Sequence, residues 1–229
     1  MDDLARFWPP FGITITVTDG TRTLDLRVTR DDDLVALSDV QVEDIYGTHR
    51  PDYAFAWLNA PYPQRVTESL KFRWSHRAEL TTDKWSLDFI AFNESGDVVG
   101  GMDMRAADFS STRTADTGSW VFHKYQGQGY GSLMRHALAQ LAFDHLGITR
   151  LKTGWHYGNS ASAKVSEKLG YEIVESTETS PVFDGSMQPI SVAVLSKENY
   201  QRGSVTTTIT GITAELKEML GCVPTTSTH

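Results

Sequence analysis

The sequence predicts a mixed α/β (α+β) fold, and three observations lead to this prediction. Short apolar runs bounded by turn residues, which are typical of strands, occur in both halves of the chain. A glycine-rich turn joins one of these runs to a long segment with apolar residues at helical spacing. Hydrophobic residues make up 40% and charged residues 22% of the 229 residues, as in ordinary globular proteins. A chain of this length can bury a full core, as one domain or as two small ones.

The first half of the chain predicts two pairs of strands around a largely helical region. The strands are expected near 13–17, 24–28, 86–93 and 98–105. Thr29 is expected to open a helix, because three carboxylates follow it in the first turn, where they favour a helix N-terminus. The stretch 41–80 is rich in aromatic residues and predicts partial helix, broken at Pro51, Pro61 and Pro63. Residues 106–115 predict a polar loop.

The second half predicts a strand, a helix, a strand and a helix, followed by a strand pair. The first strand is expected at 119–122, and the helix after it ends at Gly147, since glycine commonly follows a helix. A strand at 150–155 and a helix between Asn159 and Gly170 come next. Strands at 171–178 and 187–195 are expected to be adjacent, with a turn at Asp184 and Gly185. The remaining expectations are a helical turn at 196–201, an edge strand at 205–210, a helix at 212–220 and a disordered tail at 223–229.

Composition excludes several classes of function. The chain has no run of about 18 apolar residues and no basic-then-apolar leader, so we expect no membrane span and no membrane partner. Its one cysteine, Cys222, cannot form an internal disulfide and fits a reducing cytoplasm. A net charge of −8 argues against nucleic-acid binding, which needs a basic face. The sequence has no H-E-x-x-H motif and no Cys/His cluster, so we expect no metal.

The segment before the long helix carries the most specific information. It reads Gln126-Gly127-Gln128-Gly129-Tyr130-Gly131. Three glycines at a strand-to-helix turn leave backbone N–H groups unobstructed at the positive end of the helix dipole, which suits a phosphate or pyrophosphate. A merely tight turn is the alternative. A dinucleotide fingerprint would need glycine where Ser132 stands, and a P-loop would need lysine there.

The spacing fits Q-x-x-G-x-G instead, with Gln126, Gly129 and Gly131 at the named positions. This is similar to the acyl-CoA pyrophosphate loop of the GNAT N-acyltransferase superfamily. The segment from Asn159 to Tyr171 resembles that family's second CoA motif, N-x-x-[AS]-x-x-V-x-x-K-L-G-[FY]. An ordinary capped amphipathic helix would explain the second segment by itself. It would not explain why that segment follows the glycine turn by one helix and one strand.

The resemblance covers about residues 10–220 and includes features of the RimJ/RimL-type branch. Residues 21–27 are similar to its T-x-R-L-x-L-R opening strand, with Thr23 in place of the usual Arg. Residues 83–87 and 118–120 resemble actinobacterial members that use acetyl- or succinyl-CoA. The resemblance implies a single domain over 1–222. Its fold would be a central mixed, mostly antiparallel sheet of about seven strands, with flanking helices and a splayed strand pair that admits pantetheine.

The same resemblance implies an acyl-CoA-dependent N-acyltransferase. Acetyl-CoA or succinyl-CoA would donate the acyl group, without a metal, to a small-molecule, peptide or protein amine that attacks directly in a ternary complex. The residues that match CoA-binding positions are Trp120, Val121, Phe122, Gln126, Gly127, Gln128, Gly129, Tyr130, Gly131, Ser132, Asn159, Ser162 and Lys164. A catalytically silent CoA-binding or sensor protein is the alternative, and the resemblance leaves a homodimer open.

The splayed strands and the group that polarises the thioester carbonyl are also assigned by resemblance. The matching strands are 98–105 and 117–122, and the donor would be a backbone N–H near Gly101 or Met102. Gly100 and Gly101 can equally mark a bulge or a tight strand crossing.

Three side chains are the expected catalytic residues: Ser162, Asp103 and His123. Most family members place a Tyr where Ser166 stands, as the acid for the leaving thiolate, whereas the RimJ/RimL branch uses a Ser at the position of Ser162. Period-2 alternation places Asp103 on the face opposite its two Met neighbours, where it could act as the general base or sit on a solvated face. His123 and His156 are alternative bases, and ordered water is another.

The aromatic stretch 41–80 would line the acceptor side in the family layout. Its candidate residues are Tyr53, Trp57, Tyr62 and Trp74, although ordinary core packing also accounts for aromatic residues at such positions. Lys124, Lys164 and Lys168 flank the CoA segments and could meet phosphates or simply be solvated.

Overall fold

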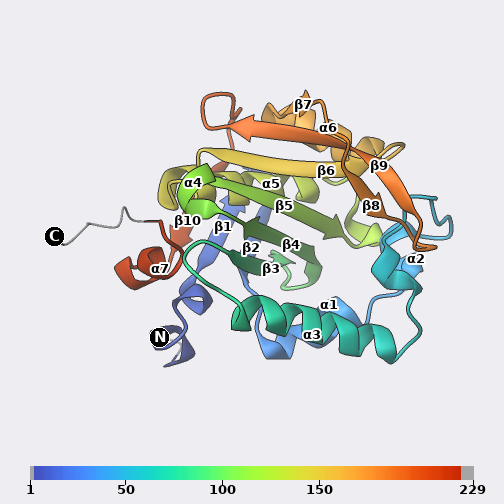
Figure 1. Cartoon of the computed structure of the whole chain (residues 1–229), viewed down its shortest axis with the longest axis horizontal. Helices are drawn as coiled ribbons and strands as arrows, with labels where there is room; N and C mark the ends of the chain where they lie inside the picture. Colours follow the sequence, from blue (N-terminus) through green and yellow to red (C-terminus); the bar gives the residue numbers. More distant parts are fainter. Residues whose placement is uncertain (1–2, 223–229) are drawn as a thin grey trace.

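The computed structural model describes residues 3–222, which build one large sheet with helices on both faces (Figure 1). The strands are β1 Thr14–Thr18, β2 Thr23–Val28, β3 Trp85–Asn93, β4 Val98–Ala106, β5 Thr114–Val121, β6 Arg150–His156, β7 Glu172–Val174, β8 Thr179–Pro181, β9 Met187–Ser196 and β10 Thr206–Thr210. The α-helices are α1 Asp31–Ser38, α2 Val42–Tyr46, α3 Gln64–Ala78, α4 Phe109–Thr112, α5 Tyr130–Gln140, α6 Ser160–Leu169 and α7 Ala214–Met219. Short helical turns are η1 Asp3–Arg6, η2 Pro9–Gly12, η3 Ala56–Asn59, η4 His123–Tyr125 and η5 Leu141–His145.

The strand order is β10-β1-β2-β3-β4-β5-β6-β9-β7, and β8 adds to β9. All paired strands in the described chain are antiparallel except β5 and β6. The predicted fold class is confirmed. The sheet has ten strands, where about seven were expected; the additional strands include β8, which pairs with β9, and β10, the predicted edge strand, which pairs with β1.

Two helical layers enclose the sheet. α3 packs beside α1 and over β3, and the two helices run together along the lower edge of Figure 1. On the other face, α5 packs against β1, β2, β4 and β5, and all its residues but Gly131 are buried. The main core therefore lies between the sheet and α5. None of the helices among residues 3–222 is both long and apolar enough to span a bilayer.

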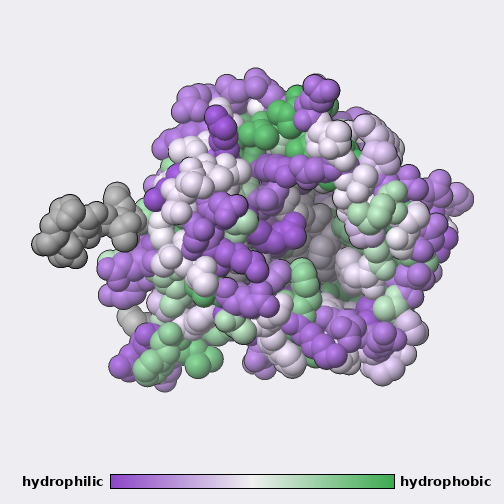
Figure 2. Space-filling view, in the orientation of Figure 1, coloured by the Kyte–Doolittle hydropathy of each residue, from purple (hydrophilic) through white to green (hydrophobic). Residues whose placement is uncertain are grey.

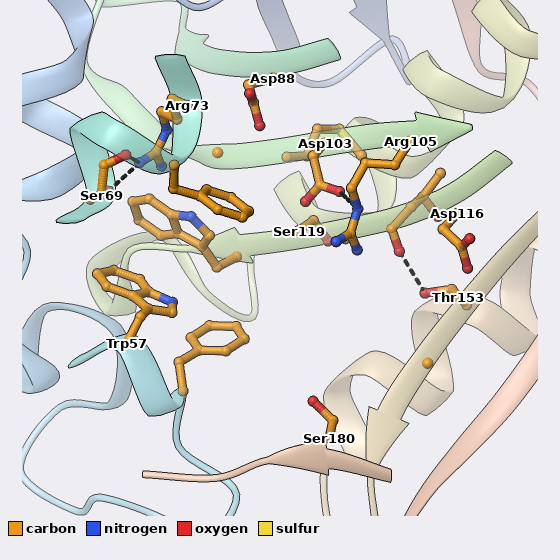
Figure 3. A pocket seen from close by; sticks show the side chains of 18 of the residues that line it. Trp57, Ser69, Arg73, Asp88, Asp103, Arg105, Asp116, Ser119, Thr153 and Ser180 are labelled. Carbon is orange, nitrogen blue, oxygen red and sulfur yellow. Dashed lines mark hydrogen bonds and ion pairs between the residues drawn. The ribbon is translucent and has the colours of Figure 1, made fainter. Parts of the chain in front are cut away.

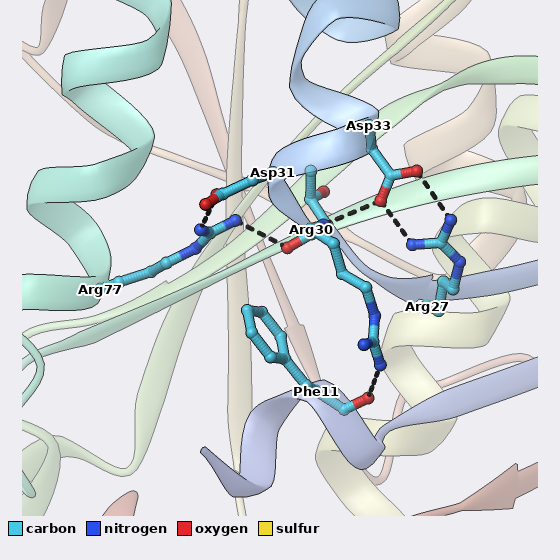
Figure 4. Close-up of polar contacts among 7 residues, drawn as sticks. Phe11, Arg27, Arg30, Asp31, Asp33 and Arg77 are labelled. Atoms are coloured by element: carbon cyan, nitrogen blue, oxygen red, sulfur yellow. Dashed lines mark hydrogen bonds and ion pairs between the residues drawn. The ribbon is translucent and has the colours of Figure 1, made fainter. Parts of the chain in front are cut away.

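The start of α1 differs from the prediction, because Arg30 rather than Thr29 precedes the helix (Figure 4). The Asp33 carboxylate accepts the Arg30 backbone N–H at 2.8 Å and also pairs with the Arg27 guanidinium. Arg77 of α3 pairs with Asp31 and donates to the Thr29 carbonyl at 2.8 Å. The predicted acidic turn is thus held by cations from β2 and α3, which fixes α3 against α1.

Residues 106–115 are not a loop throughout, as was expected. Within this range, Phe109–Thr112 form the short helix α4. The helix is anchored by Phe109, which is fully buried and whose ring meets that of Trp85 edge-on at 5.2 Å. β5 then begins at Thr114, earlier than the predicted 119, because Ala115 is buried and pairs with Ala106. Phe122, expected within the strand, follows its end.

The C-terminal elements largely match their predictions. Of the strand expected at 171–178 only 172–174 form a strand, β7, and the next strand, β8, begins after it at Thr179; both pair with β9. The turn at Asp184 and Gly185 is present, with Gly185 at φ 84°. Within the helical turn expected at 196–201, residues 197–199 form a turn. β10 and α7 stand where the last strand and helix were expected. The tail predicted at 223–229 lies outside the described residues.

Candidate functional site

β5 and β6 run parallel and separate after a short paired region. They pair from Thr114–Arg150 to Asp116–Lys152, while β5 continues to Val121 and β6 to His156. The splayed pair was assigned to 98–105 and 117–122, and this is wrong. Those segments, β4 and β5, are antiparallel and paired from Gly100–Val121 to Ala106–Ala115.

The expected carbonyl donor near Gly101 or Met102 is wrong for the same reason. β4 is an inner strand, and both residues pair with β3 on one side and β5 on the other, so their N–H groups face neighbouring strands. Gly100 instead fits the alternative interpretation of this glycine pair, a bulge or a tight strand crossing. The register shifts beside it, and a Cβ on Gly100 would lie 2.1 Å from the Trp120 carbonyl oxygen, so it marks a bulge with close strand contact.

Side chains hold β5 and β6 together where their backbone pairing stops. Thr153 Oγ1 donates to the Thr117 carbonyl at 3.1 Å, and Thr117 Oγ1 donates to the Lys152 carbonyl at 3.2 Å. Arg135 of α5, which is buried, donates to Thr153 Oγ1 at 2.9 Å and to Ser119 Oγ at 3.3 Å. The gap therefore opens at a defined position instead of fraying.

The backbone of β5 beyond this point is directed into the gap at alternate residues. Phe122 N–H donates to Val99 of β4, whereas the Thr117 carbonyl faces β6. Because pairing directions alternate along a strand, Ser119 and Val121 also face the β6 side, where no strand partner remains. The Val121 carbonyl on this edge accepts from the Gln126 side chain at 2.8 Å. The N–H groups of Ser119 and Val121 are therefore the donors that this edge offers to a ligand in the gap.

The glycine turn stands at the end of β5. Gln126 donates to the carbonyls of Val121 at 2.8 Å and Ile45 at 2.6 Å, which fixes the turn between β5 and α2. Gly127 has φ 72° and Gly129, directly before α5, has φ 90°, both in the region that favours glycine. The first N–H groups of α5 have no partner within the helix, as at any helix start.

Two neighbours make this turn suitable for an anion. Ser132 Oγ is buried in the first turn of α5 and has no hydrogen-bond partner among the described residues. Arg22, from the β1–β2 turn, brings Nη1 to 3.3 Å from the position that a Gly129 Cβ would take. These donors fit the pyrophosphate of CoA, which the sequence predicted here. Lys164 is exposed on α6, and Lys124 lies over the Tyr125 ring.

The start of α6 stands at the end of β6, beside the same gap. Asn159 Oδ1 accepts the Ser162 N–H at 3.1 Å, which confirms the predicted cap. Ser162 is partly exposed on the first turn. Ser166 lies one turn later on the same face, but it is 1% exposed and its Oγ has no hydrogen-bond partner among the described residues. A ligand in the gap can therefore reach Ser162 more readily than Ser166.

A cavity of about 770 Å³ lies on the opposite face of the sheet, between the strands and α3 (Figure 3). Its sheet wall includes Asp88 of β3, Asp103 of β4 and Asp116 of β5, and Thr117, Ser119 and Thr153 carry it to the splayed strands. Trp57, Ser69 and Arg73 line it from η3 and α3, and Ser180 from β8. Figure 2 shows a hollow in the middle of this face among largely hydrophilic residues.

Asp103 stands on the cavity wall in an unusual setting. Its carboxylate pairs with Arg105 Nε at 2.8 Å and faces Gly118, where a Cβ would lie only 2.7 Å from Asp103 Oδ1. Burial raises the pKa of the Asp103 carboxyl; Arg105 opposes this rise, and Asp88 adds to it. A carboxylate with a raised pKa is a better proton acceptor than an ordinary surface aspartate.

Asp88 and its partner were missed by sequence reasoning. Asp88 is the register partner of Asp103 on β3, and its Oδ2 lies 3.3 Å from Nδ1 of His76 on α3. In the sequence, Asp88 stands between the apolar residues Leu87 and Phe89, and this alternation predicts only that its side chain faces away from the core. The opposing Asp103 could not be inferred, because strand register is non-local.

The two histidines proposed as bases do not line this cavity. His123 packs against Gly47, where a Cβ would lie 2.7 Å from His123 Nε2, and it borders a separate cavity with Glu43 and Lys124. His156 borders another cavity, with Tyr53, and burial lowers its pKa. Of the three candidate bases, Asp103 alone lines the large cavity.

The aromatic residues of 41–80 divide between cavity and surface. Trp57 lines the large cavity and Tyr53 the neighbouring one of about 400 Å³. Trp74 is 47% exposed and bonds to Asp31, and Tyr62 is 64% exposed, so neither forms the acceptor wall as expected. Among residues 3–222, no group of three or more His, Cys, Asp or Glu is placed to hold a metal.

The family described as acetyltransferase (GNAT) domain matches residues 24–172. RimJ of Mycobacterium smegmatis, in complex with a CoA disulfide, is 18% identical with a TM-score of 0.66, over 85% of this chain and 91% of that chain. Spermidine N-acetyltransferase of Vibrio cholerae, in complex with CoA and spermine, is 12% identical with a TM-score of 0.59, over 77% and 97%. RimL, a ribosomal alpha-N-protein acetyltransferase in complex with coenzyme A, is 16% identical with a TM-score of 0.60, over 79% and 97%. At these identities the structures establish a shared fold.

The glycine turn generates a first prediction. Gly129→Val should abolish CoA binding in a folded protein, because a branched side chain at φ 90° strains the turn and occupies the space beside Arg22. Calorimetric titration with CoA measures the effect. Gly203→Val is the matched control, since Gly203 also has positive φ but open space around it and lies in the turn before β10. Unchanged CoA affinity in folded Gly129→Val would refute the assignment.

Proposed function

This chain belongs to the GNAT acetyltransferase family, as its two CoA-like segments predicted, and from that premise we propose that it transfers an acetyl or succinyl group from CoA to a primary amine. The observation that carries the proposal is the gap between β5 and β6. Both CoA-like segments begin at the ends of these strands, and the cavity on the other face reaches the same strands at Ser119 and Thr153. Donor and acceptor can therefore meet across the gap without an acyl-enzyme intermediate. A cytoplasmic location belongs to the same proposal, supported by the single cysteine.

Each chemical task has a proposed group in this arrangement. The gap-facing N–H of Ser119 or Val121 polarises the thioester carbonyl, replacing the donor first expected on β4. Asp103 accepts the ammonium proton, directly or through water, and Ser162 protonates the departing thiolate. The acceptor approaches through the large cavity, from the side of residues 41–80 and 178–187. Trp57, Arg73 and Ser180 on its walls support this direction.

Thiol release tests the proposed function. Purified protein is mixed with acetyl-CoA or succinyl-CoA and a panel of primary amines, and free CoA thiol is measured over time. We expect thiol release that depends on both the acyl-CoA and the amine. Mass spectrometry of the acyl-CoA that copurifies with the protein identifies the natural donor. Tight CoA binding without thiol release for any pair would instead favour the silent CoA-binding alternative.

The surroundings of Asp103 predict how the rate depends on pH. The ionised carboxylate is the active form, so kcat/KM rises with pH, and its midpoint lies above the ordinary pKa of an aspartate because burial raises that pKa. Arg105→Gln should move the midpoint up, since Arg105 lowers the pKa of Asp103, and Asp88→Asn should move it down. Asp103→Asn should lower kcat by about a hundredfold or more.

The variants separate Asp103 from the acceptor amine, which also loses a proton as pH rises. The amine's own ionisation does not depend on Arg105 or Asp88. A midpoint that is identical in the wild type and both variants would therefore remove Asp103 from the role of base.

Ser162 and Ser166 supply a matched pair of variants for the thiolate. Ser162→Ala should lower kcat by roughly ten- to a thousandfold with little change in KM for the donor, as expected for an interaction made in the transition state. Ser166→Ala should matter far less, because Ser166 is buried within the helix packing. Steady-state kinetics with varied acetyl-CoA measures kcat and KM for both variants. The reverse order of effects would show that the wrong serine was chosen.

A further inference from the structure

α3 lines the large cavity with a stripe of polar residues that the proposed reaction does not use. Arg65, Ser69 and Arg73 are spaced four residues apart, so they share one face of the helix, and all three line the cavity. Figure 3 shows Ser69 and Arg73 on this side, with Asp88 and Asp103 on the sheet side. The cavity thus has a cationic helix wall opposite an acidic sheet wall.

Arg65 is the most unusual member of the stripe. It is 6% exposed, and its Nη1 donates to the carbonyls of Leu58 and Ala60, each at 3.3 Å. Its Nε and Nη2 are buried and have no hydrogen-bond partner among the described residues. These two atoms form one fork of the guanidinium, the geometry that binds two oxygens of a carboxylate. A buried donor without a partner is costly, so a ligand that completes it is favoured.

The neighbouring charges do not neutralise this fork. Glu68 also lines the cavity on α3, but its carboxylate pairs with Lys71 at 3.0 Å and is largely exposed. Arg73 Nη1 is bonded to the Ser69 hydroxyl and carbonyl, which holds its guanidinium beside Ser69. On the sheet wall, Asp103 pairs with Arg105, and Asp116 lies 3.6 Å from Lys152.

We propose that Arg65, with Ser69 and Arg73 beside it, forms a subsite for a carboxylate that one of the two substrates carries into the cavity. This inference rests on the proposed acyltransferase function and names the chemistry of a substrate. A single negative charge fits better than a phosphate dianion, because three aspartates line the opposite wall. The carboxylate belongs either to the acceptor, whose amine then faces the acidic wall, or to the far end of the acyl chain.

Two matched substrate pairs in wild-type protein distinguish these sources. The acceptor pair is γ-aminobutyrate and n-butylamine, and the donor pair is succinyl-CoA and butyryl-CoA, with equal chain lengths within each pair. We expect the carboxylate member of one pair to have a kcat/KM at least about tenfold higher, as for a charge-assisted bidentate contact. The pair that shows this preference identifies which substrate carries the group.

Variants then assign the preference to α3. Arg65→Lys keeps the positive charge but loses the fork, and it should reduce the kcat/KM ratio within the preferred pair by about tenfold. Arg73→Gln should reduce the same ratio and covers the case in which Arg65→Lys fails to fold. Lys71→Gln is the control on the same helix, since Lys71 is exposed and does not line the cavity; its ratio should equal that of the wild type.

The outcomes separate this inference from the proposed function. Ratios near one in both wild-type pairs, together with measurable acyl transfer, would overturn the carboxylate subsite and leave the acyltransferase function standing. A preference that survives both Arg65→Lys and Arg73→Gln would also overturn it. An absence of acyl transfer from all donors to all acceptors would reject the proposed function itself.

Discussion

The rest of the structure depends on the point at which β5 and β6 stop pairing. A parallel pair that separates leaves backbone groups without partners, which is costly inside a protein unless other groups or a ligand satisfy them. Here Thr117 and Thr153 replace the first lost backbone bonds, and Arg135 reaches from α5 to both strands. The separation is therefore fixed in position. Because α5 follows β5 and α6 follows β6, the same separation brings both helix starts to one gap.

The charged side chains near this gap differ in sign between the two faces of the sheet. Arg135 is a buried cation on the α5 side, fixed by hydroxyl groups, while on the cavity side Asp103 and Asp88 lie opposite each other on adjacent strands. Two neighbouring carboxylates disfavour each other's ionisation, and nearby arginines reverse part of that effect. The pKa of Asp103 therefore results from several elements: burial in the sheet, Arg105 on the same strand, Asp88 on β3 and His76 on α3. A substitution at any of these neighbouring side chains therefore changes the pKa of Asp103, the proposed base.

The sequence could predict the features that are local, and it failed where pairing is long-range. The glycine turn and the Asn159 cap could be predicted because each depends on residues close together in the sequence: glycines where φ is positive, and an Asn side chain that accepts an N–H three residues later. The splayed strands were assigned to the wrong pair, since nothing local states that Gly101 lies between two strands or that residues 114–116 pair with 150–152. Trp74 and Tyr62 were expected in the pocket because aromatic residues usually seek burial, but the α1–α3 contact turns Trp74 towards Asp31.

The same distinction explains why the donor class was readable and the acceptor was not. The donor site is built on two continuous segments, each with its own helix start. The large cavity is instead assembled from η3, α3, β8 and five inner strands (β3, β4, β5, β6 and β9), and each contributes only a few residues. Arg65 shows the consequence: in the sequence it is one of several cations on an exposed-looking helix, and its burial arises only because η3 folds back so that Leu58 and Ala60 receive its Nη1. In the proposed function, specificity for the acceptor therefore resides in contacts between segments, so substitutions on α3 change that specificity without altering the glycine turn.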